Sequence, residues 1–141
     1  MLVDLKTYEL LIGPNCTVVF ENDPLRGLLP SGDDLIVSMI LEYGDADIKK
    51  IKVTQLRNIE NTVYISILGN ERVYGRQVDL APINETETNS IFQLRFQFKQ
   101  GQIVDFKDLK NKVSIGIGHD LYPYQVFIPD ALKEKLIKYF A

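Results

Sequence analysis

The sequence predicts a mainly β (α+β) fold, an antiparallel β-barrel or sandwich of six to seven strands with a C-terminal amphipathic helix and one or two short helices. Several short segments alternate between apolar and polar side chains, which is typical of strands with one buried face. Turn-forming residues separate these segments. A chain of 141 residues is long enough to bury one core, so we expect residues 1–141 to form a single β-rich domain.

The first part of the chain is expected to hold a short helical turn within residues 4–11 and then two strands. The turn residues Gly13-Pro14-Asn15 precede a β-branched, apolar run at residues 17–21. Residues 35–43 also alternate, but their second face is partly apolar. This pattern predicts a central strand that is covered on both sides for part of its length.

Residues 47–57 fit two structures. Ile48 and Ile51 share one helical face with Leu56, and Asn58 could end the helix in a left-handed conformation. A strand through Ile51 fits almost as well. The sequence leaves helix and strand open here.

The middle of the chain predicts a hairpin. Residues 63–68 form a β-rich run that ends at the turn signal Gly69-Asn70. Residues 72–80 are the expected partner strand, with Gly75 as a candidate bulge.

The clearest strand pattern lies at residues 91–99. Four apolar side chains occupy one face and four polar side chains the other, namely Phe92, Leu94, Phe96 and Phe98 against Gln93, Arg95, Gln97 and Lys99. We expect the apolar four to be buried together. Arg95 is then expected to be solvated, with a buried ion pair to an acidic residue as the alternative.

The last part of the chain predicts a strand pair and a helix. Residues 113–117 pair with residues 124–128, and Asp130 is placed to cap a helix over residues 130–140. Apolar residues recur along that helix at Leu132, Leu136 and Phe140, and Lys133 is expected to point outward. The connections are expected at residues 22–34, 44–46, 82–89 and 100–110.

Composition excludes several classes of protein. A net charge of −3 argues against a nucleic-acid binder that neutralises phosphates. The chain has no apolar run long enough to span a membrane, and its N-terminus lacks the pattern of a signal peptide. The single cysteine, Cys16, permits no internal disulfide, so we expect a cytoplasmic protein.

The only histidine, His119, is the main candidate for chemistry. It follows Gly116-Ile117-Gly118, so a strand could present its ring at a loop tip. His119 and Asp120 are the catalytic candidates, and a ligand site would combine His119 with Tyr122 and Tyr124. An ordinary hairpin turn is the favoured interpretation, because adjacent residues of a strand point apart.

The sequence predicts no metal site and no cofactor. One histidine and one cysteine cannot build a structural zinc site. A few acids could join His119 around Mn²⁺ or Fe²⁺, namely Asp33, Asp34, Glu42, Asp45, Glu85 and Glu87, but solvated loop acids are the favoured interpretation. Cys16 would need His119 as a base, and a cysteine before an apolar run is more often a core residue.

Several short sequence segments, taken in order along the chain, resemble those of an uncharacterised bacterial and archaeal family known only as a domain of unknown function. They are Gly13-Pro14-Asn15 with residues 17–21, then residues 29–35, 40–43 and 56–61 before Val63-Tyr64, then residues 94–96 and 116–124. The resemblance implies a small soluble protein whose gene tends to lie beside rubrerythrin-like and iron–sulfur oxidoreductase genes. It supplies no catalytic residues.

The chain departs from the family pattern at three places. Asn58 stands where the family has glycine, which still fits a helix end. His119-Asp120 stands where the family often has the reverse order, which puts an inherited role for the pair in doubt. A longer insertion typical of the family is absent between Glu21 and Leu29.

Two functions follow from these observations. The favoured one is a small soluble accessory protein that binds a protein partner or a small ligand, with a link to redox or metal stress implied by the resemblance. The alternative is an enzyme or metal-binding protein with a site around His119. The small number of candidate catalytic residues favours the first function. The sequence does not decide whether the protein forms a homo-oligomer.

Overall fold

The computed structural model describes residues 8–22, 28–67, 71–78 and 88–140. Within these ranges the chain forms strands β1 (Glu9–Leu11), β2 (Cys16–Phe20), β3 (Asp34–Glu42), β4 (Val63–Ile67), β5 (Arg72–Tyr74), β6 (Arg76–Gln77), β7 (Asn89–Gln97), β8 (Val113–His119) and β9 (Tyr122–Phe127). The helices are α1 (Ala46–Gln55), the 3₁₀ helix η3 (Ile59–Thr62), α2 (Gln100–Lys107) and α3 (Asp130–Ile137).

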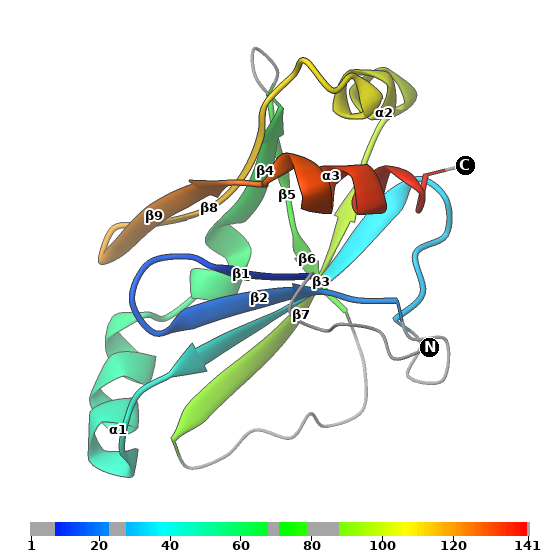
Figure 1. Cartoon of the computed structure of the whole chain (residues 1–141). Helices are drawn as coiled ribbons and strands as arrows, with labels where there is room; N and C mark the ends of the chain where they lie inside the picture. Colours follow the sequence, from blue (N-terminus) through cyan, green and yellow to red (C-terminus); the bar gives the residue numbers. More distant parts are fainter. Residues whose placement is uncertain (1–7, 23–27, 68–70, 79–87, 141) are drawn as a thin grey trace.

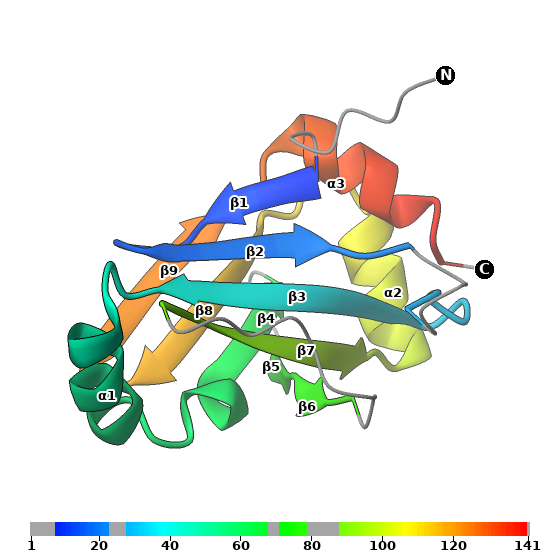
Figure 2. The ribbon, with the colours of Figure 1, turned by 90° about the horizontal axis from the view of Figure 1, so that it is seen from below.

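The strands form two antiparallel sheets. One has the order β1-β2-β3-β7-β6 and the other the order β5-β4-β8-β9 (Figure 1). The strands of the second sheet cross behind those of the first (Figure 2). The predicted mainly β fold with a C-terminal helix is confirmed, and of the two predicted forms it is sandwich-like, because the sheets do not close into a barrel. The described strands exceed the predicted number because β1 is too short to show alternation and because the expected strand at residues 72–80 is divided into β5 and β6.

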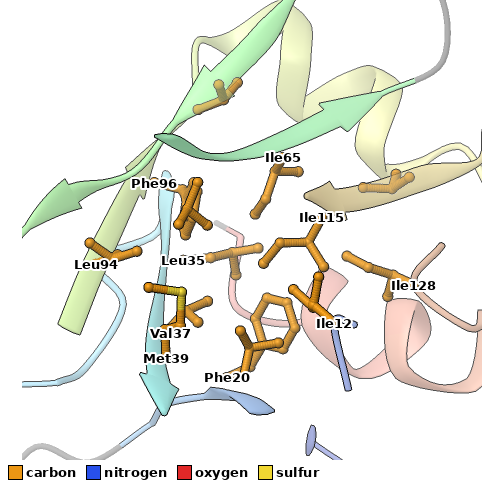
Figure 3. Close-up of a cluster of buried hydrophobic side chains, with 14 of the residues drawn as sticks. Ile12, Phe20, Leu35, Val37, Met39, Ile65, Leu94, Phe96, Ile115 and Ile128 are labelled. Atoms are coloured by element: carbon orange, nitrogen blue, oxygen red, sulfur yellow. The ribbon is translucent and has the colours of Figure 1, made fainter. Parts of the chain in front are cut away.

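One cluster of buried side chains lies between the sheets (Figure 3). Strand β3 is the central strand of its sheet and pairs with β7 along its full length. It contributes Leu35 and Val37 to the cluster, which also contains Phe96 from β7 and Ile115 from β8. The predicted apolar face of β7 is buried except at Phe92, which is only half-buried at the margin of the cluster.

The predicted hairpin of residues 63–68 and 72–80 is only partly right. Arg72–Tyr74 pairs with β4, but Arg76–Gln77 pairs with β7 in the other sheet. Gly75 is therefore a crossing point between the sheets and not a bulge. A Cβ atom at Gly75 would lie 2.9 Å from Cζ of Phe96, so a side chain at this position would displace the core. The predicted turn at Gly69-Asn70 and the end of the hairpin lie outside the described residues.

The first half of the chain differs from one expectation and agrees with another. Residues 9–11 form a strand and not a helical turn, because they pair with β2, while residues 4–7 lie outside the described part. Residues 46–55 form a helix, so the helical interpretation of this segment is right. Its start is capped by Asp45, whose Oδ1 accepts a hydrogen bond of 2.8 Å from the backbone N–H of Ile48.

Helix α1 nevertheless buries no side chain. The face predicted to pack, with Ile48 and Ile51, is exposed, and only Leu56 beyond the helix enters the core. Asn58 has a φ of 65°, as expected for a left-handed residue after a helix. The helix projects from one end of the sheets (Figures 1 and 2).

The expected connection at residues 100–110 contains helix α2. Its start is fixed by Gln102, whose Oε1 accepts a 2.8 Å hydrogen bond from the N–H of Lys99. Its apolar face packs Ile103 and Phe106 into the core. The ring of Phe106 meets those of Phe98 and Phe140 edge-on, with centroids 5.2–5.9 Å apart.

Helix α3 packs on the sandwich through Leu132 and Leu136, as predicted. Asp130 is not the N-cap, because Pro129 holds that position and Asp130 lies in the first turn. Lys133 is not outward but buried, with 1% of its surface exposed. Its Nζ donates a 2.6 Å hydrogen bond to the carbonyl of Asp108 and another to that of Asn111, so it binds the turn that follows α2.

Candidate functional site

His119 is the last residue of β8 and pairs with Tyr122 across the hairpin turn Asp120-Leu121. Its Nδ1 accepts a hydrogen bond of 3.1 Å from the N–H of Leu121, so the proton of the neutral ring is on Nε2. Nε2 lies 3.2 Å from the carbonyl of Arg57 and donates to it. The ring therefore ties the β8–β9 hairpin to the turn after α1. Asp120 is exposed and bonds to neither ring nitrogen.

Tyr122 is a buried residue that anchors the turn between β1 and β2. Its hydroxyl lies 3.0 Å from the carbonyl of Ile12 and also contacts the carbonyl of Pro14. Burial raises the pKa of Tyr122, with smaller contributions from Cys16 and Tyr124. This hydroxyl stays protonated and serves as a structural donor near neutral pH.

Tyr124 lies beside Tyr122 on β9, with their ring centroids 4.6 Å apart in an edge-on arrangement. Its ring covers Gly13, where a Cβ atom would lie 2.5 Å from Cγ of the tyrosine. Gly13 also has a φ of +69°, so both space and backbone conformation favour glycine at this turn. The close fit holds the Tyr124 ring in place although 40% of the residue is exposed.

The two tyrosines line a cavity of about 210 Å³, which we call the hairpin hollow. Its walls come from the β1–β2 turn, the end of β3, α1 and the β8–β9 hairpin, and they comprise Pro14, Asn15, Leu41, Glu42, Tyr43, Ile48, Lys52, Gln55, Leu56, Leu121, Tyr122 and Tyr124. His119 and Asp120 are not among these residues. Of the side chains expected in a ligand site, Tyr122 and Tyr124 lie in the wall, and the His119 ring is turned toward Arg57.

Apolar side chains surround the mouth of the hairpin hollow. Leu121 is 63% exposed and Ile48 is 42% exposed. Glu42 and Lys52 add one charge of each sign to the lining. The hollow is smaller than the roughly 300–1,000 Å³ of ordinary small-molecule pockets. Its size suits one inserted side chain better than a cofactor.

Comparison with known proteins identifies the family of this chain. A model for the family described as "Protein of unknown function (DUF3501)" matches residues 23–140. The chain belongs to the DUF3501 family. The predicted membership of an uncharacterised family is thereby confirmed.

One solved structure extends the comparison of this DUF3501 protein. A novel protein of unknown function from Burkholderia pseudomallei K96243 has a TM-score of 0.81 and 19% sequence identity to it. The match covers 97% of this chain and 86% of that chain, and at this identity the likeness concerns the fold alone. No curated protein matches the sequence.

Two of the acids considered as metal ligands, Asp34 and Asp45, have structural partners in this DUF3501 protein, while Glu85 and Glu87 lie outside the described residues. Asp45 caps α1, and Asp34 accepts a 2.6 Å hydrogen bond from the N–H of Ser31 and pairs with Nε of Arg95 at 3.0 Å. The alternative for Arg95, an ion pair with a buried acid, is therefore what the fold contains. Across the described residues, no three histidine, cysteine or acidic side chains come together as a metal site. None of the helices described is long and apolar enough to cross a membrane.

Cys16 is fully buried at the start of β2, and burial raises the pKa of its thiol to about 12. The thiolate is the reactive form of cysteine, so we expect the native protein to resist iodoacetamide at mildly alkaline pH. The same treatment in denaturant should label Cys16 completely, as measured by intact mass. Rapid labelling of the native protein would contradict the buried position of this thiol.

Sequence reasoning does not identify the part that α1 and the Pro14-Asn15 turn play in the hairpin hollow. Two features of the sequence indicate that these segments have a role outside the core. Leu121 is an apolar residue at the tip of a two-residue turn, where polar residues or glycine are usual. Ile48 and Ile51 lie on a helix whose apolar face finds no place in the core.

Proposed function

We propose that this DUF3501 protein is a non-catalytic accessory module that docks a protein partner through the hairpin hollow. The observation that carries the proposal is the ring of exposed apolar side chains, Leu121, Tyr124 and Ile48, around a cavity of about 210 Å³. Apolar side chains gathered in this way around a concave site are typical of interaction surfaces.

Helix α1 supports the proposal. Its large apolar side chains are all exposed, including Ile51 at 58% and Val53 at 46%. A helix without buried side chains gains little stability from the core. A partner that covers α1 and fills the hairpin hollow would bury this apolar surface, which is favourable by roughly 25 cal/mol per Å².

The partner chemistry follows from the lining. Tyrosine walls and a small volume favour one apolar or aromatic side chain as the anchor, with Glu42 and Lys52 available for polar contacts at the margin. The family resemblance implies gene neighbours that encode rubrerythrin-like and iron–sulfur oxidoreductases. We therefore propose as partner a protein that acts in the response to redox or metal stress.

The alternative, an enzyme or metal-binding protein centred on His119, has less support. Both ring nitrogens of His119 are engaged by backbone groups, so the ring can neither take a proton from a substrate nor bind a metal without losing one of these contacts. Cys16, the one thiol, is buried and protonated. The hydroxyl of Tyr122 is held by backbone carbonyls.

Leu121→Asp is the variant that tests the docking proposal. We expect it to abolish enrichment of a partner from cell extract of the native organism, because it places a charge at the mouth of the hairpin hollow. Quantitative mass spectrometry against the wild-type protein measures the enrichment. The candidate is then purified, and its affinity for both proteins is measured by calorimetry.

Leu109→Asp is the matched control, because Leu109 is similarly exposed at 57% and lies in the turn after α2. It should retain the partner. Equal binding by wild type and Leu121→Asp, or equal loss in both variants, would rule out the hairpin hollow as the docking site.

A further inference from the structure

A second concave site lies where the chain crosses between the sheets. It encloses about 560 Å³ and is bounded by β5 and β6 on one side and by the end of β7 and the start of α2 on the other. We call it the corner groove. It shares no lining residue with the hairpin hollow.

The corner groove is strongly positive on a protein of net charge −3. Among the described residues that line it, four are cationic, namely Arg72, Arg76, Arg95 and Lys99, and one is acidic, Glu71. The Lys99–Glu71 pair spans 3.5 Å with both side chains well exposed, so it neutralises little of the charge.

Sheet register brings two of the arginines together. Arg76 on β6 is the direct cross-strand partner of Arg95 on β7. Like charges in opposite positions of an antiparallel pair destabilise a sheet. Asp34 compensates part of this repulsion at Arg95, and an anion bound between the two guanidinium groups would compensate Arg76 as well.

The positions of the arginines are partly fixed. The buried carboxylate of Asp34 holds Nε of Arg95 at 3.0 Å, while 43% of the Arg95 side chain stays exposed. The guanidinium of Arg72 stacks on Tyr64, 4.0 Å from the ring centroid. Arginine side chains held in this way lose less entropy when they bind, and their planar donors match the oxygens of a phosphate.

Helix α2 adds to the positive potential. Lys99 and Gln102, at its N-terminal end, line the corner groove. The N-terminus of a helix carries partial positive charge and favours phosphate groups. The remaining wall contains Gln97 and the larger apolar side chains Val73, Phe98 and Tyr74, the last of which is half exposed.

We propose that the corner groove binds a small organic phosphate, with Arg76 and Arg95 on the phosphate group and the Tyr74 side on its organic part. The volume lies within the range of ordinary small-molecule sites. The net negative charge of the protein favours a small molecule over a nucleic acid.

Phenyl phosphate is the probe for this site, because it combines a phosphate with an aromatic ring. A two-dimensional NMR titration of the ¹⁵N-labelled full chain should show saturable shifts at residues 71–77 and 95–102. Phenol, which lacks the charge, should produce none. Pyrophosphate should shift the same residues, because it shares the phosphate chemistry.

Arg76→Gln should weaken phenyl phosphate binding by about tenfold or more, as expected for the loss of a charge-assisted contact. Arg76 is exposed, so the fold should survive, and a thermal melt verifies this. Arg57→Gln is the matched control, since it removes the same charge from an exposed arginine outside the groove, and it should leave the affinity unchanged. Arg95 is not replaced, because its loss would leave Asp34 buried without its cation.

Three results would overturn the proposal. They are the absence of saturation at millimolar phenyl phosphate, an equal loss of affinity in Arg76→Gln and Arg57→Gln, and tighter Arg76-dependent binding of a single-stranded oligonucleotide than of phenyl phosphate. The last result would make the groove a nucleic-acid site.

Discussion

Phe96→Ala is expected to lower the free energy of unfolding by about 3–5 kcal/mol, the usual cost of truncating a buried phenylalanine. Phe96 is fully buried between the sheets, and its ring abuts Gly75 at the crossing between them. The truncation therefore leaves a cavity at the corner where β5, β6 and β7 meet. Strands on both sides of that corner limit how far the cavity can collapse.

Gln97→Ala is the control one residue along β7, where the side chain is exposed and donates a 3.2 Å hydrogen bond to the carbonyl of Asp33. This change should stay within roughly 0.5 kcal/mol of wild type. Urea denaturation followed by circular dichroism measures both variants. Losses of similar size would show that Phe96 and Gln97 do not differ in burial as described.

Lys133→Met is expected to lower the free energy of unfolding by about 2–4 kcal/mol. The change keeps the apolar stem but removes two hydrogen bonds from a charged donor, each worth about 1.5–3 kcal/mol. Burial lowers the pKa of Lys133, against the opposing effect of Asp108 and Asp130. Part of the stabilisation from the two hydrogen bonds therefore offsets the cost of burying the ammonium group. The expected loss is accordingly less than the sum of two strong bonds.

Lys138→Met serves as the control, because Lys138 is exposed at the end of the same helix. It should stay within roughly 0.5 kcal/mol of wild type. The readout is the midpoint of urea denaturation for the two variants. If Lys133→Met were as stable as wild type or more stable, the free-energy cost of burying the ammonium group would be at least as large as the stabilisation from its hydrogen bonds to the turn after α2.

The strands could be predicted where alternation was long enough to show one wet and one dry face. Residues 91–99 are the clear case, although Gln93 on the expected polar face is buried. Residues 113–117 and 124–128 also lie largely in strands, but residues 113–117 are buried on both faces. The same pattern cannot tell which sheet a strand joins. Arg72 and Arg76 belong to one expected strand, yet Gly75 sends them to different sheets.

Helices were harder to predict where local signals were few. Helix α2 begins without a serine, threonine or aspartate cap and contains Gly101, so its composition reads as a loop. The signal was the spacing of Ile103 and Phe106, which share a helical face. The burial of Lys133 was not predictable, because it depends on carbonyls more than twenty residues away.

The candidate site also has features that the sequence predicts and features that depend on the tertiary fold. The prediction that Tyr122 and Tyr124 flank one site rests on their spacing along a single strand, and both side chains lie on the hairpin hollow. The direction of the His119 ring depends on Arg57, which is distant in sequence. The corner groove unites residues from β5, β6, β7 and α2, so only the tertiary fold reveals it.

The packing of Phe140 against Phe98 and Phe106 has a consequence for how the chain acquires its fold on the ribosome. At a translation rate of about 5–20 residues per second, Phe140 is added about 6–25 s after Cys16, the first residue of β2. During that interval the sheets lack the side chains that α3 contributes to their shared core. The nascent chain therefore carries uncovered apolar strands for seconds, which is the kind of surface that chaperones bind, and its native packing can be completed only after residue 140 leaves the exit tunnel.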